Sequence, residues 1–354
     1  MRLAIQLASQ MKGQTTPNPP VGAVVVNNNV VVGIGAHLTY GEDHAEVIAL
    51  NMAGKKTAGG TLYVTLEPCS HYGKTAPCVD YIIRKKIRRV VIACKDLNKK
   101  VAGRGIVKLK QAGIEVEIGL LEKEALSLYD VFFHYISTKL PFVTLKTAVS
   151  LDGKTATTSL ESKWITNETC RIDAHTYRHQ YDAILVGINT VLRDNPSLTT
   201  RIPGGRNPIR VILDTNLRTP VDANIVTDEQ AETWIFVGSN VKNDKLEMFP
   251  SKFVRIIRMK EKTIQIKQVL QLLGREKIAS LLVEGGAEIN HSFLTERQIN
   301  QLIMYIAPII IGGEKAPGVF GGDGFTRLTD ALQLQINEIK NLDEQIKIVA
   351  TKEE

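Results

Sequence analysis

The fold and chemistry expected of the first part of this sequence depend on three short segments. They are His44-Ala45-Glu46, Pro68-Cys69 and Cys78. One imidazole and two thiolates suit a tetrahedral zinc ion and leave its fourth position to water, which is the arrangement of a catalytic zinc site. Glu46 is not needed as a ligand. It can take a proton from water whose pKa zinc lowers toward ~7, and deliver that proton to a departing amino group. The pattern therefore predicts a hydrolytic zinc centre.

A structural zinc site, or a pair of idle core thiols, is the competing interpretation, because a histidine and a glutamate two residues apart form a weak pattern on their own. We expect His44 and Cys69 each to lie where a helix begins, since the positive end of a helix favours the thiolate that zinc requires. The chain has only four cysteines, which are too few for a disulfide framework. The other two, Cys94 and Cys170, are expected to be structural.

An alternation of strands and helices surrounds these residues and predicts an α/β fold. Two β-branched runs, 21–26 and 30–35, flank Asn27-Asn28-Asn29 and predict a hairpin. Further elements expected in this part are strands at 61–66, 89–94 and 115–119 and helices at 45–52, 79–86, 105–111 and 123–135.

A domain boundary is expected at 137–141, where an apolar helix ends and a strand restarts at 142–149. No GxGxxG sequence follows a strand beyond it, which disfavours a Rossmann cofactor site. Glu284-Gly285-Gly286 instead joins a strand to a helix, and its glycines allow backbone N–H groups to approach a phosphate at the positive helix end. The elements expected here are strands at 183–187, 209–213, 233–237, 253–257, 280–283 and 302–311, helices at 168–180, 266–273 and 289–294, and a hairpin of 332–339 and 345–350.

Length and composition fit two compact domains, 1–140 and 141–354. The chain has 354 residues, of which 44% are hydrophobic and 23% charged, as in ordinary globular proteins. Its apolar runs are far shorter than the ~20 residues of a membrane span, and its start lacks a signal-peptide core, so we expect a cytoplasmic protein without a membrane partner. Residues 1–140 hold 18 Lys and Arg against 11 Asp and Glu, whereas 141–354 hold 26 of each. The basic first part fits nucleic acid, a phosphorylated small molecule or simply a solvated face.

Residues 1–140 resemble the cytidine deaminase superfamily, whose signature is H-x-E followed by P-C-x-x-C, except that the second cysteine here lies nine residues after the first. With Thr16–Val24 (TPNPPVGAV) and Cys69–Cys78 (CSHYGKTAPC), they resemble the deaminase domain of the bifunctional riboflavin-biosynthesis deaminase/reductase family. Residues 142–354 resemble the reductase domain of that family. The resemblance implies a cytidine-deaminase-like three-layer α/β/α domain followed by a dihydrofolate-reductase-like α/β domain that uses NADPH. The segments that carry the second match are Lys146–Lys154, Ser162–Thr166, Asp182–Arg201, Ile212–Thr215, Val283–Gly286 and Ala307–Gly313.

For the first domain, the resemblance implies that Asn18 and His37 hold the pyrimidine side of a substrate. It also implies that the base, the ribose or its phosphate is held by His71, Lys74, Asp96 and Asn98. The chemistry agrees, because Asn18 offers a donor and an acceptor to a heterocycle and Lys74 is a point charge suited to phosphate. A surface loop without a ligand is the competing interpretation for His71 and Lys74.

For the second domain, the resemblance places the phosphorylated ribose near Ser162, Arg178, Leu198, Arg201 and Glu284. The two arginines suit a phosphate clamp made of forked, charged hydrogen bonds. Lys146 and Glu284 are candidates for handling protons or sugar hydroxyls, with an internal ion pair as the competing explanation. NADPH is placed near Ala148, Trp164, Thr190, Asp194, Thr215 and the turn from Gly286 to Ser292. Trp164 either stacks on a flat ring or packs in the core.

Together these features predict a bifunctional enzyme of riboflavin biosynthesis with no nucleic-acid partner. Its zinc-dependent domain would hydrolytically remove the 2-amino group of 2,5-diamino-6-ribosylamino-4(3H)-pyrimidinone 5′-phosphate. Its NADPH-dependent domain would then reduce the ribosyl side chain to give 5-amino-6-ribitylamino-uracil 5′-phosphate. The alternatives are a tRNA or nucleotide base deaminase with an accessory C-terminal domain, and a non-catalytic RNA- or nucleotide-binding protein. The sequence leaves the oligomeric state open, a homo-oligomer included.

Overall fold

In the computed structural model, which describes residues 1–74, 76–98, 102–249 and 252–353, the two β-branched runs near the start form the expected hairpin. Strand β1 (Gly22–Asn27) pairs with β2 (Val30–Ala36) in antiparallel orientation. The turn residues Asn28 and Asn29 both have positive φ, 49° and 60°. Asparagine tolerates this conformation, and two such residues form the tight turn whose twist matches a hairpin.

The first unit, Met1–Lys139, contains a five-stranded sheet in the order β2-β1-β3-β4-β5. Its remaining strands run parallel to one another and are β3 (Thr61–Leu66), β4 (Arg89–Cys94) and β5 (Glu115–Ile118). Its helices are α1 (Arg2–Gln10), α2 (Ala45–Ala53), the 3₁₀ turn η1 (Gly54–Thr57), α3 (Cys78–Arg84), α4 (Arg104–Gln111), α5 (Glu122–Leu126) and α6 (Asp130–Thr138).

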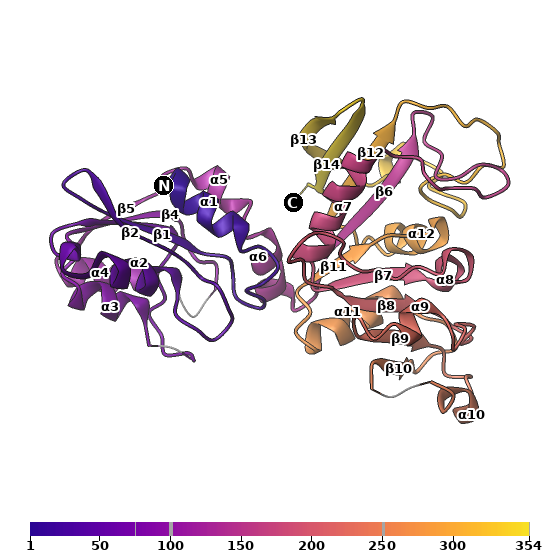
Figure 1. Cartoon of the computed structure of the whole chain (residues 1–354), viewed down its shortest axis with the longest axis horizontal. Coiled ribbons are helices and arrows are strands. Elements are labelled where there is room, and N and C mark those ends of the chain that lie inside the picture. Colours follow the sequence, from indigo (N-terminus) through magenta and orange to yellow (C-terminus); the bar gives the residue numbers. More distant parts are fainter. Residues whose placement is uncertain (75, 99–101, 250–251, 354) are drawn as a thin grey trace. The chain divides into compact units, whose positions relative to one another are not determined.

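Helices cover both faces of this sheet, so the predicted three-layer α/β/α domain is confirmed (Figure 1). Strand β4 shows how the sequence achieves this, since Ile92 packs with α2, α3 and α4 whereas its neighbour Ala93 packs with α1 and α5. The single helix expected at 123–135 is wrong. The chain breaks between α5 and α6, because Leu128 and Tyr129 turn into the core, where the Tyr129 hydroxyl donates to Thr65 Oγ1 at 2.6 Å.

The second unit, Leu140–Glu354, contains a nine-stranded sheet in the order β10-β9-β8-β7-β11-β6-β12-β14-β13. The strands from β10 to β12 are parallel, and the C-terminal hairpin β13-β14 adds in antiparallel orientation. These strands are β6 (Phe142–Ser150), β7 (Ala183–Gly187), β8 (Ile209–Leu213), β9 (Thr233–Val237), β10 (Val254–Arg258), β11 (Ser280–Val283), β12 (Gln301–Ala307), β13 (Leu334–Leu342) and β14 (Gln345–Lys352).

The helices of this unit also lie on both faces of their sheet (Figure 1). On β11, Leu281 and Val283 pack under α11 and α12, whereas Leu282 faces the side covered by α7, α8 and α9. Strand β12 ends at Ala307, four residues before the expected end, and α8 was not expected from the sequence. The helices are α7 (Glu168–Gln180), α8 (Ile188–Asp194), α9 (Asn224–Thr227), α10 (Asn243–Leu246), α11 (Ile266–Arg275), α12 (Ala287–Thr295) and the 3₁₀ turn η2 (Leu328–Asp330).

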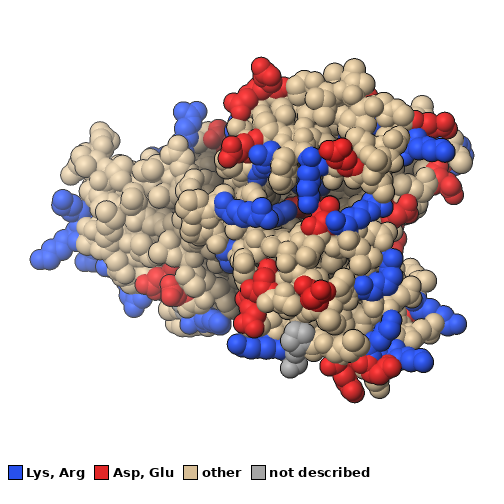
Figure 2. All heavy atoms as spheres, turned by 45° about the vertical axis from the view of Figure 1, so that its right-hand side comes forward, with Lys and Arg blue, Asp and Glu red and all other residues tan. Residues whose placement is uncertain are grey.

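The structure also bears on surface charge and on membrane-spanning helices. On the face shown in Figure 2, Lys and Arg side chains are interspersed with Asp and Glu. Among the described residues, no helix has both the length and the apolar character needed to span a bilayer.

Candidate active sites

A glycine in β2 sets the position of the helix that carries His44 and Glu46. A Cβ added to Gly35 would lie 2.3 Å from the carbonyl oxygen of Ala45, so only glycine lets α2 pack this closely on the strand. Helix α2 begins directly after His44, and Glu46 lies in its first turn with 3% of its surface exposed. The close packing therefore buries the predicted acid–base group beside the predicted imidazole ligand.

The two cysteines reach His44 from separate parts of the chain. Cys69 lies in the loop after β3, and Cys78 is the first residue of α3. The expectation that a helix begins at Cys69 is therefore wrong, because Cys69 itself is not helical and the next helix, α3, begins only at Cys78. In space, however, Cys69 Sγ does lie at the start of α3, where it accepts the backbone N–H of Cys78 at 3.3 Å. The nine-residue spacing thus brings both sulfur atoms to one helix N-terminus.

These three side chains are close enough together to hold one metal ion. Their ligand atoms all lie within 4.8 Å of one another, and His44 Nδ1 is 3.2 Å from Cys78 Sγ and 3.5 Å from Cys69 Sγ. Hydrogen bonding with Cys78, assisted by His44 and opposed by burial, lowers the pKa of the Cys69 thiol to about 4. A ready thiolate, a second sulfur and an imidazole are the donor set of a zinc site with one open position. The residues present fit zinc.

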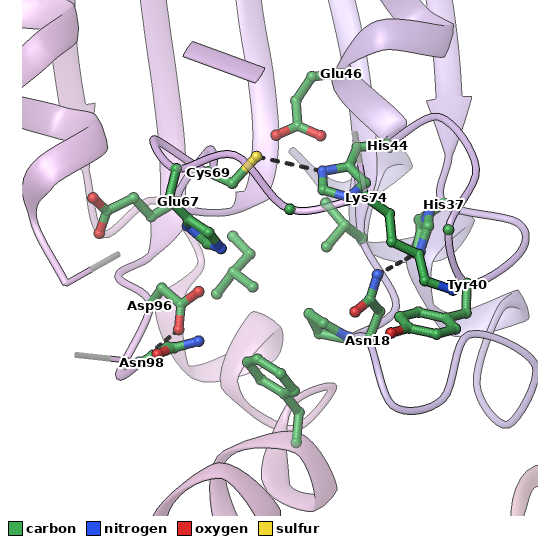
Figure 3. Close-up of a pocket in the computed structure, with 17 residues that line it drawn as sticks. Asn18, His37, Tyr40, His44, Glu46, Glu67, Cys69, Lys74, Asp96 and Asn98 are labelled. Atoms are coloured by element: carbon green, nitrogen blue, oxygen red, sulfur yellow. Dashed lines mark hydrogen bonds between the residues drawn. The ribbon is translucent and has the colours of Figure 1, made fainter. Parts of the chain in front are cut away.

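A cavity of about 260 Å³ lies beside these residues (Figure 3). The Glu46 carboxylate points toward the space between His44 and Cys69, and its pKa is raised, mainly by burial. The cavity wall brings together all six side chains that were expected to hold the first substrate, namely Asn18, His37, His71, Lys74, Asp96 and Asn98.

One side of the cavity carries a hydrogen-bonded amide and imidazole. Asn18 Nδ2 lies 3.1 Å from His37 Nε2, and His37 Nδ1 lies 3.2 Å from the carbonyl oxygen of Asp43. Burial lowers the pKa of His37, so its ring is neutral. The ring then donates from Nδ1 and accepts at Nε2, which leaves Asn18 Oδ1 as an acceptor for a ligand.

Charged groups of both signs face the same cavity. Lys74 Nζ lies 4.1 Å from the centroid of the Tyr40 ring. The Asp96 carboxylate accepts the backbone N–H of Asn98 at 2.7 Å. Burial, with a smaller contribution from the negative charge of Glu67, raises the pKa of Asp96 to about 6. The cavity therefore offers an ammonium for an anionic group and a carboxylate that titrates near neutral pH.

Three further residues that line the cavity were not predicted from the sequence, namely Tyr40, Glu67 and Phe132. Glu67 is buried and accepts the backbone N–H groups of Gly103 and Gly105 at 3.0 Å each, which fixes the start of α4 against the cysteine loop. Glu67 could have been predicted at the site, because it is an acidic residue directly before Pro68-Cys69. Phe132 could not, since an apolar residue on α6 is expected to pack in the core.

The residues expected to hold NADPH gather where parallel strands end. Helix α8 starts directly after β7, Thr215 follows β8, and α12 starts just after β11. Ligands of open α/β sheets bind at the carboxyl ends of the strands. The residues brought to this edge are Thr190 and Asp194 on α8, Thr215, and the turn from Gly286 to Ser292, while Ala148 lies on β6.

The turn after β11 fits the phosphates of such a cofactor. Within the described ranges, no side-chain hydrogen bond caps α12, whose first N–H groups follow Gly286. Gly285 has a φ of 86°, a conformation that favours glycine. A Cβ added to Gly187 would lie 2.7 Å from Ile289 Cγ1, so this glycine lets α12 approach the end of β7. Backbone N–H groups at a positive helix end form a site for a pyrophosphate.

Arg178 and Glu284 contact each other. The guanidinium donates to both carboxylate oxygens, at 2.9 and 2.8 Å, and to the Thr199 carbonyl oxygen at 3.0 Å. Burial opposes ionisation of Glu284, but the charges of Arg178 and Lys146 outweigh it and lower the pKa of Glu284 to about 2. Glu284 thus forms an internal ion pair, with Arg178 as its partner.

We expect Glu284→Gln to lower the free energy of unfolding of the second unit by about 3 kcal/mol at pH 7, because it leaves a buried guanidinium without its counter-charge. The side chains of Arg178 and Glu284 are only 16% and 11% exposed. Urea denaturation measures the change. In the matched control, Glu276→Gln breaks the exposed pair with Arg255 and should cost less than about 1 kcal/mol. Equal costs for both variants would contradict the prediction.

The other residues expected at the second site differ in their accessibility. Trp164 is 68% exposed, and the guanidinium carbon of Arg171 lies 4.7 Å from the centroid of its ring. The interpretation that Trp164 packs in the core is therefore wrong. Leu198 has a buried side chain, which leaves its backbone for contacts, whereas Ser162 is partly buried and Arg201 exposed. Sequence reasoning missed His175 on α7, whose buried Nδ1 has no hydrogen-bond partner among the described residues.

A deaminase-type zinc centre and a nucleotide-binding α/β unit in one chain define a bifunctional deaminase and reductase. Residues 1–94 match the family model for the cytidine and deoxycytidylate deaminase zinc-binding region, and residues 141–348 match that of the RibD C-terminal domain. The chain belongs to the RibD family of riboflavin biosynthesis proteins, with a zinc-dependent deaminase domain and an NADPH-dependent reductase domain. This excludes the two alternative interpretations, a base deaminase with an accessory C-terminal domain and a non-catalytic RNA- or nucleotide-binding protein.

Named relatives match over nearly their whole length. The riboflavin biosynthesis protein RibD of Bacillus amyloliquefaciens is 49% identical, covering 99% of this chain and 95% of the relative, and that of Aquifex aeolicus is 44% identical, covering 98% and 96%. The structure of Acinetobacter baumannii RibD matches with a TM-score of 0.87 at 37% identity, covering 100% and 98%. The diaminohydroxyphosphoribosylaminopyrimidine deaminase/5-amino-6-(5-phosphoribosylamino)uracil reductase of Thermotoga maritima matches with a TM-score of 0.89 at 36% identity, covering 99% and 97%.

Proposed function

We propose that residues 1–140 hydrolytically remove the 2-amino group of 2,5-diamino-6-ribosylamino-4(3H)-pyrimidinone 5′-phosphate. Residues 141–354 then reduce the ribosyl side chain of the product with NADPH, giving 5-amino-6-ribitylamino-uracil 5′-phosphate. The observation that carries the proposal is the cluster of His44, Cys69 and Cys78, of which His44 and Cys69 line one cavity together with Glu46. The Thermotoga maritima protein, which matches along the whole chain, is named for both activities.

In the first domain, His44, Cys69 and Cys78 would hold zinc. Bound there, zinc would act as a Lewis acid and lower the pKa of a water molecule toward ~7. Glu46 accepts the proton of the attacking water and returns it to the departing amino group, for which its buried position beside the ligands is suited.

The remaining cavity residues orient the substrate. Asn18 Oδ1, left open by the bond to His37, accepts from the pyrimidine edge. Lys74 attracts the phosphate by its charge. His71, Asp96 and Asn98, which also line the cavity, contact the base or the ribose.

In the second domain, residues around the strand ends hold the cofactor and the sugar. NADPH would supply the hydride. The residues that would hold it are Ala148, Trp164, Thr190, Asp194, Thr215 and the turn Gly286–Ser292. Lys146 and Glu284 face the ribosyl group. As the hydride adds to C1′ of the ribose, the bond between C1′ and the ring oxygen breaks, and Lys146 donates a proton to that oxygen. Arg201 binds the phosphate, and Arg178, through its pair with Glu284, shapes the wall together with Ser162 and the backbone of Leu198.

Deamination should weaken at acidic pH because Asp96 loses its charge. With a pKa of about 6, the carboxylate that accepts from the substrate prevails above pH 6 and is lost below it. We expect the KM for deamination to rise up to tenfold for each pH unit below about 6. The Asp96→Asn variant should lose this pH dependence, which separates Asp96 from the substrate phosphate that titrates in the same range. Parallel KM–pH profiles in both proteins would contradict the assignment.

The experiment that tests the function follows both half-reactions separately. The purified zinc-loaded protein should release ammonia from the diaminopyrimidine substrate in the absence of NADPH. It should oxidise NADPH when the deaminated intermediate is supplied. Ammonia release from RNA instead, with strongly salt-dependent binding, would overturn the proposal.

The expected compartment follows from the same site. All four cysteines are free thiols, and thiols are kept reduced in the cytosol, where Cys69 and Cys78 stay available to a metal. We therefore place the activity in the cytoplasm, with a phosphorylated small molecule rather than nucleic acid as its partner.

A further inference from the structure

Lys146 lies on the sheet face that α7 covers. Strand β6, which carries Lys146, is flanked by β11 and β12. Leu145 pairs with Val283 of β11, so the residues that follow them, Lys146 and Glu284, lie side by side in the same register. Because alternate residues of neighbouring strands share a face, Lys146 and Glu284 both face α7. The Arg178–Glu284 pair described above joins α7 to the sheet on this side of Lys146.

A second charged cluster joins α7 to the sheet on the other side, and the mechanism above does not use it. Tyr305 of β12 is 1% exposed, and its hydroxyl donates to Asp173 of α7 at 2.6 Å. Lys347 of β14 is 5% exposed and donates to the same carboxylate at 3.1 Å. The Lys347 ammonium also lies 5.1 Å from the centroid of the Tyr177 ring. With its hydroxyl held in this cluster, the Tyr305 ring is fixed in orientation.

The fixed ring faces Lys146. Lys146 Nζ lies 5.7 Å from the centroid of the Tyr305 ring, within the ~6 Å at which an ammonium is attracted to an aromatic face. In the part of the chain that the structure describes, no hydrogen bond or ion pair holds this ammonium. The Tyr305 ring and the charge of Glu284 both attract this ammonium and help to set its position.

We propose that Tyr305, held by Asp173 and Lys347, is a positioning residue that aims the Lys146 ammonium at the ribosyl group during reduction. The inference rests on the proposed role of Lys146. Tyr305 itself is 1% exposed and so offers almost no surface to a substrate or cofactor. Its ring keeps the ammonium in place when the proton is needed, so its loss acts on the rate of reduction rather than on the binding of NADPH.

Two substitutions separate the ring from its hydroxyl. Tyr305→Leu removes the ring and should lower the reductase kcat roughly tenfold, with the KM for NADPH unchanged. Tyr305→Phe keeps the ring and should retain about half of the kcat. Both are measured in the full chain with the deaminated intermediate and NADPH, and ammonia release by the intact first domain serves as the internal control. A kcat for Tyr305→Leu equal to that of the wild type would overturn the proposal.

A double-mutant cycle tests whether Tyr305 acts through Lys146. Lys146→Ala alone should lower the reductase kcat, and adding Tyr305→Leu should then cause no further loss. A further tenfold loss would mean a merely structural role for Tyr305 and would overturn the inference. A wild-type kcat for Lys146→Ala would instead overturn the proposed role of Lys146, and this inference with it.

The matched control is Tyr181→Leu, which also removes a buried tyrosine that is hydrogen-bonded to β6, through Thr144. It should lower the melting temperature as Tyr305→Leu does, yet leave the reductase kcat unchanged. A tenfold loss of kcat in this control would show that any buried tyrosine has the same effect, and would also overturn the proposal.

Discussion

Replacing Glu46 by glutamine should lower the rate of deamination by roughly 100- to 10,000-fold, the usual contribution of a positioned acid–base group. Glutamine keeps the size of the side chain but cannot take the proton of the attacking water. The residue lies buried in the first turn of α2, beside His44, so the substitution leaves the zinc ligands in place. Ammonia release under saturating substrate measures the effect.

The second domain provides the control for Glu46→Gln within the same molecule. NADPH oxidation with the deaminated intermediate should proceed at the wild-type rate, and the zinc content should not change. Deamination at more than about a tenth of the wild-type rate would show that another group handles the proton.

Removal of one thiolate should abolish metal binding together with deamination. In Cys69→Ala the remaining imidazole and sulfur offer two ligands where a catalytic zinc site has three. We expect the zinc content to fall from about one per chain to below about a tenth, and ammonia release to become undetectable. Elemental analysis of the purified variant measures the metal directly.

Cys94→Ala is the matched control for the loss of a thiol. Cys94 is also buried in the first domain, but its Sγ donates to the Thr65 carbonyl oxygen at 3.2 Å rather than facing His44. The variant should keep its zinc and its deaminase activity. Equal zinc loss in the two variants would contradict the assignment of Cys69 as a ligand.

Much of the fold was predictable because its signals are local. The two β-branched runs around Asn28 and Asn29 specify a hairpin without help from the rest of the chain. The break between α5 and α6 was not predictable, since the apolar spacing continues through Leu128 and Tyr129 and no glycine or proline interrupts it. It is the burial of these two residues against the sheet, a tertiary effect, that ends the helix.

The zinc ligands were predictable for chemical reasons, whereas the surroundings of both sites were not. Few arrangements other than a metal site place a histidine, a glutamate and two cysteines in this order. The partner of Arg178 lies 106 positions away at Glu284, and no spacing rule connects them. Phe132 likewise enters the cavity wall only because α6 folds back against it.

The two cysteines also enclose the segment that supplies His71, Gly73 and Lys74 to the cavity wall. Insertions or exchanges there would alter which molecules are accepted while the hydrolytic apparatus stayed whole. Part of the selectivity of this domain would therefore reside in one loop whose two ends are fixed by the zinc-binding cysteines, while Asn18, His37, Asp96 and Asn98 on other elements line the rest of the cavity.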